Sequence, residues 1–302
     1  MATVTVGALL AGCAGTAGPE PIAPTGPPAT GAHPTGGPTT DPVALIGNWT
    51  VTADGGDGGV LRLAPSDQGD LMWFDRCGVS MGTWRADAGG LFVADLSGRS
   101  RSDRPGCPSD PRQGPDWLPR AAAFRTAGDT PILLDDRGRQ VARLAPGGRP
   151  TPGPNLLPAL AEPPVVTPEV RRALAPADPL PAGLTPADRA ALLGRWVPVV
   201  ARRSGPAVPG GDRRGGPTPA YVELRDGGAW RGSDGCNGQG GRWTAGAAGA
   251  LLATAGPSTL IGCENVPVAG WLSTAARAGL DGDVLVLVDA RGTETERLRR
   301  DG

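Results

Sequence analysis

The sequence predicts an α+β chain, mainly antiparallel β, in which two β-rich modules follow one another and each carries one helix and one disulfide. The strongest observation is a repeat, because the segment Ala44–Trp49 returns as Ala191–Trp196 with Ala, Leu, Gly and Trp at the same places. In each half a cysteine is followed by a tryptophan seven residues later, and the eight tryptophans divide four and four. Internal similarity of this kind indicates one structural unit used twice.

The N-terminal segment 1–13 has the pattern of an export signal. Val4–Leu10 is a short, mostly apolar run that leads into Leu-Ala-Gly-Cys at residues 10–13. Spanning a bilayer takes about 20 apolar residues, whereas a short apolar core followed by small residues is typical of a secretory signal. The Leu-Ala-Gly-Cys sequence resembles the bacterial lipobox, which implies a lipid on the thiol of Cys13. The n-region, Met1-Ala2-Thr3, departs from that pattern because it has no Lys or Arg.

Two segments have the composition of connections. Residues 14–40 are rich in Pro, Gly and Thr and cannot bury enough apolar surface to fold, so we predict a disordered tether of about 30 Å. Residues 147–185 are rich in Pro and predict a semi-rigid linker between the modules. Within the linker, Glu169–Leu174 predicts one helical turn capped by Thr167-Pro168.

The first module is assigned to residues 41–146. Asp41-Pro42 predicts a short helical turn that ends before Gly47. A helix is expected near Trp117–Phe124. Apolar alternation between turn residues predicts strands at Val60–Leu63, Leu71–Phe74, Thr83–Arg85 and Leu91–Ala94, and a hairpin of Ile132–Leu134 with Gln140–Leu144.

The second module is assigned to residues 186–302. Thr185-Pro186-Ala187-Asp188 predicts a helix start with Thr185 as N-cap. One longer helix is expected over Asn265–Ala278, with Gly279 ending it, and the insertion Arg202–Pro219 is expected to be a loop. Strands are predicted from Trp196, over Ala220–Arg225, around Trp230, over Arg242–Thr244 and Ala250–Ala253, and as a hairpin of Val284–Val288 with Glu294–Leu298.

Four cysteines remain when Cys13 is set apart, two in each module. Four cysteines permit three pairings, but each module should close on itself, which selects Cys77 with Cys107 and Cys236 with Cys263. Cysteines of exported proteins oxidise. No Cys-x-x-Cys motif and no neighbouring histidine accompanies them, so we expect no metal site.

The second half resembles the META domain of HslJ-like bacterial lipoproteins. The resemblance rests on Leu192-x-Gly-x-Trp, on Gly235-Cys236-Asn237, and on Ser258-Thr259 placed before Cys263, and it covers most of residues 191–300. The first half is similar but degenerate, because Gly follows its first module cysteine and no Ser-Thr pair precedes the second. The family implies an antiparallel β fold with a helix, an envelope location, links to heat shock or drug tolerance, and no established catalytic activity. Asn237 is also explained by turn chemistry, which we favour.

Charge and composition exclude several classes of function. The 29 basic residues are all arginine and nearly balance 30 acidic ones, so no global field would attract nucleic acid. The use of arginine without lysine, together with abundant Ala, Gly and Pro, is typical of a GC-rich bacterium. The only histidine, His33, lies in the tether, which removes histidine-based triads and metal sites. Asp135-Asp136 is interpreted as a turn, Asp54–Asp57 lacks the ligands of a calcium loop, and Gly238–Gly241 lacks a P-loop lysine.

These observations predict a lipid-anchored protein on the extracytoplasmic face of the cell membrane, without cofactor, acting as a non-enzymatic binding or scaffolding component that could have an envelope protein partner. Two alternatives stay open. One is an inhibitor of a secreted hydrolase such as lysozyme or a peptidase, with Arg202–Pro219 as the inserted loop. The other is a lipocalin-like binder of a small apolar ligand, indicated by Gly47-x-Trp49.

Overall fold

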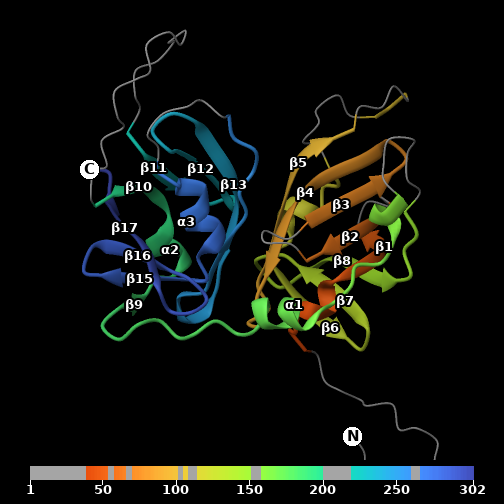
Figure 1. The fold of residues 1–302 in the computed structure, drawn as a ribbon, viewed down its shortest axis with the longest axis horizontal. Coiled ribbons are helices and arrows are strands. Elements are labelled where there is room, and N and C mark those ends of the chain that lie inside the picture. The colour runs from red at the N-terminus through yellow and green to blue at the C-terminus, as the bar shows by residue number, and fades with distance from the viewer. Residues whose placement is uncertain are drawn as a thin grey trace, which may run out of the picture. The chain divides into compact units, whose positions relative to one another are not determined.

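The computed structural model describes most of the chain that follows the N-terminal segment. Within the described residues the chain is mainly antiparallel β-structure, as the sequence predicts (Figure 1). Residues Gly36–Gly302 group into one compact unit. The predicted signal with Cys13, the tether up to residue 38, the Asp54–Asp57 segment, residues 200–218 and Cys263 lie outside the described residues. The described ranges are 39–53, 58–65, 70–100, 105–107, 114–150, 158–199, 219–259 and 266–302.

The first sheet has eight strands in the order β5-β4-β3-β2-β1-β8-β7-β6. Its two outer strands meet at an isolated bridge between Leu91 and Ala123, where Phe92 N donates to Ala122 O at 3.0 Å. The sheet therefore closes into a barrel, here called barrel one, and closure leaves few unpaired edges. Its strands are β1 Gly47–Ala53, β2 Gly59–Ala64, β3 Asp70–Asp75, β4 Gly78–Ala86, β5 Phe92–Arg99, β6 Ala123–Ala127, β7 Thr130–Leu134 and β8 Gln140–Pro146.

The second sheet has nine strands in the order β14-β13-β12-β11-β10-β17-β16-β15-β9. Leu251 N donates to Ala276 O at 3.0 Å beside the bridge of Ala250 with Arg277, so β14 and β15 meet and form barrel two. The ninth strand, β9 Thr185–Pro186, pairs with β15. The others are β10 Gly194–Pro198, β11 Tyr221–Leu224, β12 Ala229–Ser233, β13 Gly238–Ala245, β14 Leu251–Ala253, β15 Arg277–Asp281, β16 Val284–Val288 and β17 Glu294–Arg300.

Tryptophans fill the interior of both barrels. In barrel one, Trp73 meets Trp117 edge-on with ring centroids 5.7 Å apart, a geometry that aromatic quadrupoles favour. Trp49 Nε1 donates to Leu45 O at 2.8 Å, which satisfies the buried indole N–H. The central residues of barrel one include Leu45, Trp49, Leu61, Leu63, Trp73, Trp84, Phe92 and Trp117, and those of barrel two include Leu192, Trp196, Trp230, Trp243, Leu251, Val268, Trp271 and Leu287.

Most of the predicted helical structure is shorter than expected. Asp41 caps a 3-10 turn, η1 Pro42–Leu45, as the sequence predicts, by accepting from Val43 N at 2.9 Å. The prediction of a helix near Trp117–Phe124 is wrong, because only η2 Leu118–Arg120 is helical and Ala123–Ala127 is strand β6. Two further short helices are η4 Ala247–Gly249 and α2 Arg189–Leu192.

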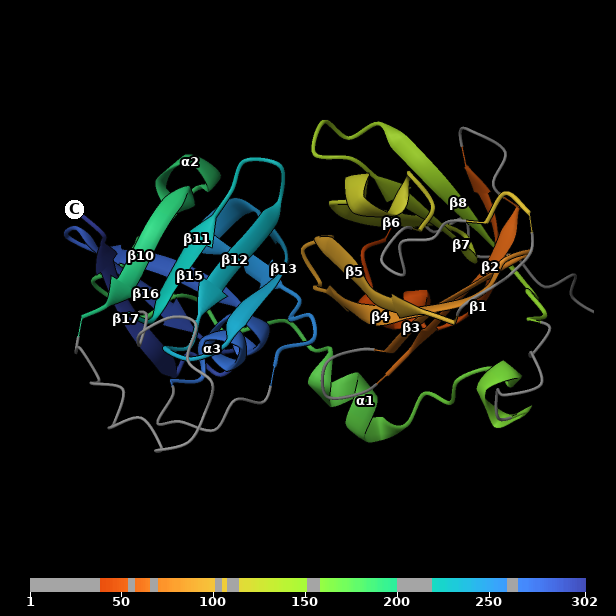
Figure 2. The ribbon, with the colours of Figure 1, turned by 90° about the horizontal axis from the view of Figure 1, so that it is seen from above.

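Two expectations for the second half need correction. Asp188, not Thr185, is the N-cap of α2, accepting from Ala191 N at 2.7 Å, because Thr185 is engaged in β9. The helix expected over Asn265–Ala278 is α3 Val268–Thr274, and the chain then enters β15. The expected stop residue Gly279 pairs with Val286 and Pro186 inside the sheet. α3 contacts β13, β14 and β16 (Figure 2).

The Pro-rich linker contacts both barrels near the ends of its described part. Its predicted turn exists as α1 Pro168–Ala173, with Thr167 Oγ1 accepting from Val170 N at 3.4 Å. Before it, Leu160 of η3 Pro158–Ala161 packs on an apolar cluster of barrel one, made of Met72, Phe74 and Val79. After it, Arg277 Nε donates to Asp178 O at 2.5 Å, so the end of the linker is tied to barrel two.

Candidate functional site

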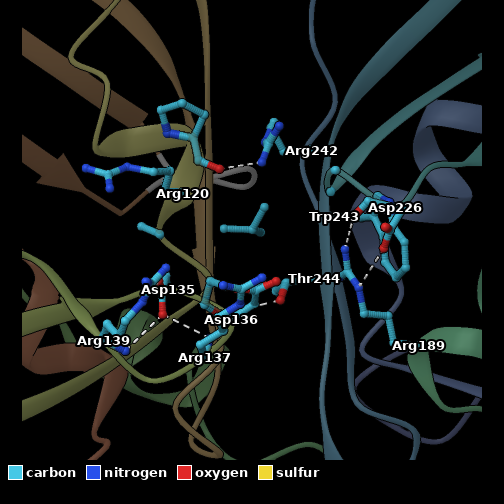
Figure 3. A pocket seen from close by; sticks show the side chains of 16 residues that line it. Arg120, Asp135, Asp136, Arg137, Arg139, Arg189, Asp226, Arg242, Trp243 and Thr244 are labelled. Atoms are coloured by element: carbon cyan, nitrogen blue, oxygen red, sulfur yellow. Dashed lines mark hydrogen bonds and ion pairs between the residues drawn. The ribbon is translucent and has the colours of Figure 1, made fainter.

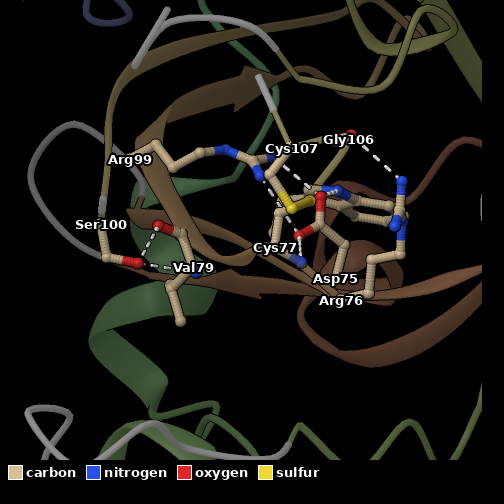
Figure 4. Close-up of a disulfide and its surroundings, with 9 residues drawn as sticks. Asp75, Arg76, Cys77, Val79, Arg99, Ser100, Gly106 and Cys107 are labelled. Carbon is tan, nitrogen blue, oxygen red and sulfur yellow. Dashed lines mark hydrogen bonds and ion pairs between the residues drawn. A yellow bond between two sulfur atoms is a disulfide. The ribbon is translucent and has the colours of Figure 1, made fainter. Parts of the chain in front are cut away.

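The disulfide of barrel one is organised by a carboxylate. Cys77 and Cys107 are bonded with their Cα atoms 5.5 Å apart, the pairing expected from the sequence (Figure 4). Asp75, the last residue of β3, accepts from Cys77 N at 2.7 Å. Asp75 Oδ2 also accepts from Trp73 Nε1 at 3.1 Å and from Arg99 Nη2 at 2.8 Å. The turn that positions Cys77 is thus fixed by one carboxylate with three kinds of donor.

Barrel two places Asp234 in the same relation to Cys236. Asp234 Oδ1 accepts from Cys236 N at 2.8 Å and from Asn237 N at 2.6 Å. Its Oδ2 accepts from Asn237 Nδ2 at 3.1 Å and from Gln239 Nε2 at 3.2 Å. Cys236 is disulfide-bonded, and Cys263, the partner that the sequence predicts, lies outside the described residues.

Asn237 connects this turn to the rest of the motif. Its Oδ1 accepts from Thr259 Oγ1 at 2.6 Å, and Ser258 Oγ donates to Gly238 O at 3.2 Å. Gly235 has a φ of 104°, a left-handed conformation that favours glycine. The motif residues therefore do come together, in a network in which Asp234 and Asn237 are each only 3% exposed.

Two members of this network escaped sequence reasoning. Asp234 and Gln239 are as central as Asn237, since Gln239 Oε1 also accepts from Ala269 N in the first turn of α3 at 2.9 Å. The available signal was the recurrence of Asp two residues before each module cysteine, Asp75-x-Cys77 and Asp234-x-Cys236. The arrangement is that of a structural turn, as favoured for Asn237.

Asp135 has the structural role expected from its hairpin turn. Asp135 Oδ1 accepts from Arg137 N and from Arg139 N, both at 2.9 Å. Desolvation alone would raise the pKa of Asp135, but these hydrogen bonds and the Arg139 guanidinium at 2.7 Å lower it below the usual value. Gly238–Gly241, the glycine-rich segment that lacks a P-loop lysine, lies within strand β13.

A cavity of about 310 Å³ lies where the two barrels meet, and it is here called the groove (Figure 3). Barrel one contributes η2 and the turn between β7 and β8, and barrel two contributes α2, β13 and the turn between β11 and β12. Sequence reasoning missed the groove, because its walls come from segments that are distant in the chain. Its charged lining residues are Arg120, Asp135, Asp136, Arg137, Arg139, Arg189, Asp226 and Arg242.

Direct contacts between the barrels involve residues that line the groove. Arg242 Nη2 donates to Pro119 O, and Thr244 Oγ1 donates to Ala122 O at 3.4 Å. Beyond the groove, Arg85 of β4 reaches the carbonyls of Ala253 and Leu272. A Cβ added at Gly246 would lie 3.1 Å from Leu91, so glycine permits this close approach.

The guanidinium of Arg242 is half-buried between charges of both signs. Burial lowers the pKa of Arg242, as does the neighbouring Arg189, while Asp95 acts in the opposite direction. Arg189 lies over the Trp243 ring, 4.6 Å from its centroid. Arg189 Nε lies 3.8 Å from Asp226 Oδ1, whose side chain is 91% exposed. Such a site is suited to contact charged groups, because two guanidinium groups lie on one wall of a concave surface.

No family model, curated protein or solved structure matches this chain. Across the described ranges, no three His, Cys, Asp or Glu side chains gather closely enough to hold a metal ion. Among the helices of those same ranges, none has the length and apolar character needed to cross a membrane. The geometry of the turns and of the groove is therefore the ground for a functional proposal.

Proposed function

We propose that this chain is an exported, lipid-anchored envelope protein of two META/HslJ-like modules that works by binding. The export and anchoring part rests on the sequence at Cys13 and on the Pro-rich residues 14–40. A lipid on Cys13 and a solvated tether would hold the barrels clear of the membrane surface. Stable anchoring takes more than one acyl chain, which lipidation of an N-terminal cysteine supplies.

Matching strand orders support the proposal that the two modules are copies. When nine is added to each strand number of barrel one, its strand order becomes the order of β10 to β17 in barrel two. The hydrogen bond from Trp49 Nε1 to Leu45 O, 2.8 Å long, has a counterpart from Trp196 Nε1 to Leu192 O at 2.9 Å. Corresponding hydrogen bonds at corresponding positions are expected when one structural unit has been duplicated.

The closing hairpins add a second match. Asp135 Oδ1 accepts from the backbone N–H groups two and four residues later, and Asp289 Oδ1 does the same with Arg291 N at 2.8 Å and Thr293 N at 2.9 Å. The modules differ in their helices, because barrel one has the 3-10 turn η2 where barrel two has α3. The helix proposed for the second module corresponds to α3, which is accompanied by the short α2, whereas the described residues of barrel one contain only 3-10 turns.

The groove is the observation that carries the binding role. The polar residues of the motif are engaged with one another, as the Asp234 and Asn237 contacts illustrate. The groove, in contrast, is concave, open to solvent and lined by charge from both barrels. Concave sites with a few placed polar groups are where ligands bind.

The packed interiors weigh against the lipocalin-like alternative. That alternative requires an apolar cavity inside the barrel, but Trp49, Trp73 and Trp117 occupy the inside of barrel one and are each no more than 7% exposed. The hydrolase-inhibitor alternative depends on Arg202–Pro219, nearly all of which lies outside the described residues. It is kept as an outcome of the test.

Intact-mass measurement of the membrane-extracted protein tests the proposal. We expect an N-terminus at Cys13, the added mass of acyl chains, and four oxidised module cysteines. A matched Cys13→Ala variant should lose the acyl mass and leave the membrane fraction. Native chain without a lipid would refute the anchored form, and free thiols in either module would refute the disulfide expected there. Inhibition of lysozyme or a peptidase by the full chain would instead favour the inhibitor.

A further inference from the structure

The charge of the groove lining is unbalanced. Five arginines and three aspartates line it, so two positive charges exceed the negative ones. Arg139 and Asp135 already form a close pair at 2.7 Å, which removes one charge of each sign from consideration. Asp95, which acts on Arg242 from the edge of a neighbouring cavity of about 220 Å³, offsets part of the remaining excess.

Arg189 is only loosely held by its carboxylate partner. A direct guanidinium–carboxylate hydrogen bond measures about 2.7–2.9 Å, whereas Arg189 Nε and Asp226 Oδ1 are 3.8 Å apart. Asp226 is exposed, so this ion pair contributes little. Arg189 Nη2 does donate to the Asp226 carbonyl, and the guanidinium lies over Trp243, so its position is fixed while its charge is poorly compensated.

Arg242 faces the groove from the same wall. Its Nη2 donates to Pro119 O, which is a neutral acceptor on the opposite barrel. Figure 3 shows Arg242 reaching toward barrel one and Arg189 lying beside Asp226 on barrel two. Two guanidinium groups that repel each other are stabilised by an anion placed between them, and the partly desolvated setting strengthens that attraction.

We propose that the groove binds a small oxyanion, carried by a carboxylate or a phosphate, against Arg189 and Arg242. The inference rests on the proposed binding function and specifies the ligand chemistry. An arginine pair suits this class because the planar guanidinium matches carboxylate and phosphate oxygens in geometry. Because the walls come from both barrels, the bound anion would also add a link between them.

Calorimetric titration of the full chain in detergent, at constant ionic strength, tests the proposal. The probes are citrate and inorganic phosphate, with choline as the cationic control. Citrate binding alone identifies a carboxylate ligand, phosphate binding alone identifies a phosphate ligand, and both support the shared oxyanion chemistry. If neither binds, or if choline binds equally well, the oxyanion proposal is wrong, while the intact-mass result for Cys13 is unaffected.

Two variants and a control locate the site. Arg189→Ala should weaken binding by about tenfold or more, because it removes a charge-assisted hydrogen bond to the anion. Asp226→Asn should strengthen binding, since it removes a competing carboxylate, and a misfolded protein could not give this gain. Arg231→Ala is the matched control, because Arg231 pairs with Glu223 at 2.9 Å on barrel two but does not line the groove. Equal affinity of Arg189→Ala and the native chain would place the anion elsewhere and overturn the assignment.

Discussion

Asp75 and Arg99 form a two-pronged ion pair beside the disulfide of barrel one, with Nη2 to Oδ2 at 2.8 Å and Nη1 to Oδ1 at 3.3 Å (Figure 4). The Arg99 side chain is 4% exposed and that of Asp75 is 19% exposed. In barrel two, amide groups of Asn237 and Gln239 serve the equivalent carboxylate, Asp234. The two barrels therefore share the turn aspartate but surround it with different side-chain donors.

Removal of Arg99 should strongly destabilise the protein. Arg99→Ala leaves the Asp75 carboxylate without its cation, and breaking a buried pair from one side costs about 3–5 kcal/mol. Urea unfolding monitored by tryptophan fluorescence measures the loss. The control is Arg139→Ala. The Arg139 side chain is 68% exposed, and its partner Asp135 keeps its backbone donors in this variant. Equal effects of the two substitutions would contradict the role given to Arg99.

Asn237 should matter for stability. Asn237→Ala removes the bonds to Asp234 and to Thr259 from a site that is 3% exposed, and unsatisfied buried partners cost about 1–3 kcal/mol each. Thermal unfolding measures the effect. Ser258→Ala is the control, because Ser258 is exposed and its contacts are only to carbonyl oxygens. Unchanged stability of Asn237→Ala would contradict the structural role given to Asn237.

The disulfide of barrel one should stabilise the folded state through its loop. Cys77 and Cys107 are 30 residues apart, for which the chain-entropy relation gives about 3–4 kcal/mol. The double variant Cys77→Ser with Cys107→Ser should have a free energy of unfolding, measured by urea denaturation, that is lower than that of the native chain by about that amount. Adding reductant to the double variant should then lower its stability further through the Cys236 disulfide alone. A double variant as stable as the native chain would show that the turn at Asp75 suffices.

The strand pattern and the turns were predictable because their causes are local. Asp41 before Pro42 and the Asp135 turn depend on side chains that bond backbone groups two to four residues away. The pairing of Cys77 with Cys107 followed from the repeat, which carries long-range information within one sequence. Such signals survive in a chain rich in Gly, Pro and Ala.

Strands β6 and β15 were not predictable from the same signals. Arg277–Asp281 holds Ala, Gly and Asp, which are depleted in strands, and Ala123–Ala127 holds two alanines beside Phe124 and Thr126. Both segments follow residues with a helical pattern. What makes them strands is closure of each barrel, since β6 meets β5 and β15 meets β14. The groove was hidden for a related reason, because Arg120 and Arg189 come from different modules and share one site only after folding.

Arg85 should control the contact between the barrels. Its Nη1 donates to Ala253 O at 3.3 Å and to Leu272 O at 3.4 Å, and burial lowers the pKa of Arg85 to about 10, so it stays charged at neutral pH. Arg85→Glu would place an anion against these carbonyl oxygens and should separate the barrels. Small-angle scattering should then show a larger radius of gyration, and residues 147–185 should be cleaved faster by a protease. Arg143→Glu on the exposed side of β8 is the control, and equal behaviour of the two variants would contradict this role.

The stability of the protein should depend on pH through Asp87 with a sign opposite to that of Asp135. Burial raises the pKa of Asp87, although bonds from Leu91 N and Gly89 N and the charges of Arg277 and Arg85 act against it. The folded chain therefore holds this proton more tightly than the unfolded chain. The stabilisation is complete below the usual aspartate pKa and is lost as the pH rises through the folded value.

Urea unfolding of Asp87→Asn across this pH range measures the effect against the native chain. Because the amide does not titrate, the stability of the variant relative to the native chain should rise as the pH increases above the usual aspartate pKa. Asp135→Asn is the matched control, since the lowered pKa of Asp135 gives stability that is present above the unfolded value and lost in acid. The stability of Asp135→Asn relative to the native chain should fall as the pH rises from acid to the usual aspartate pKa, and it should stay level above that value. Parallel curves for the two variants would show that Asp87 is not desolvated as described.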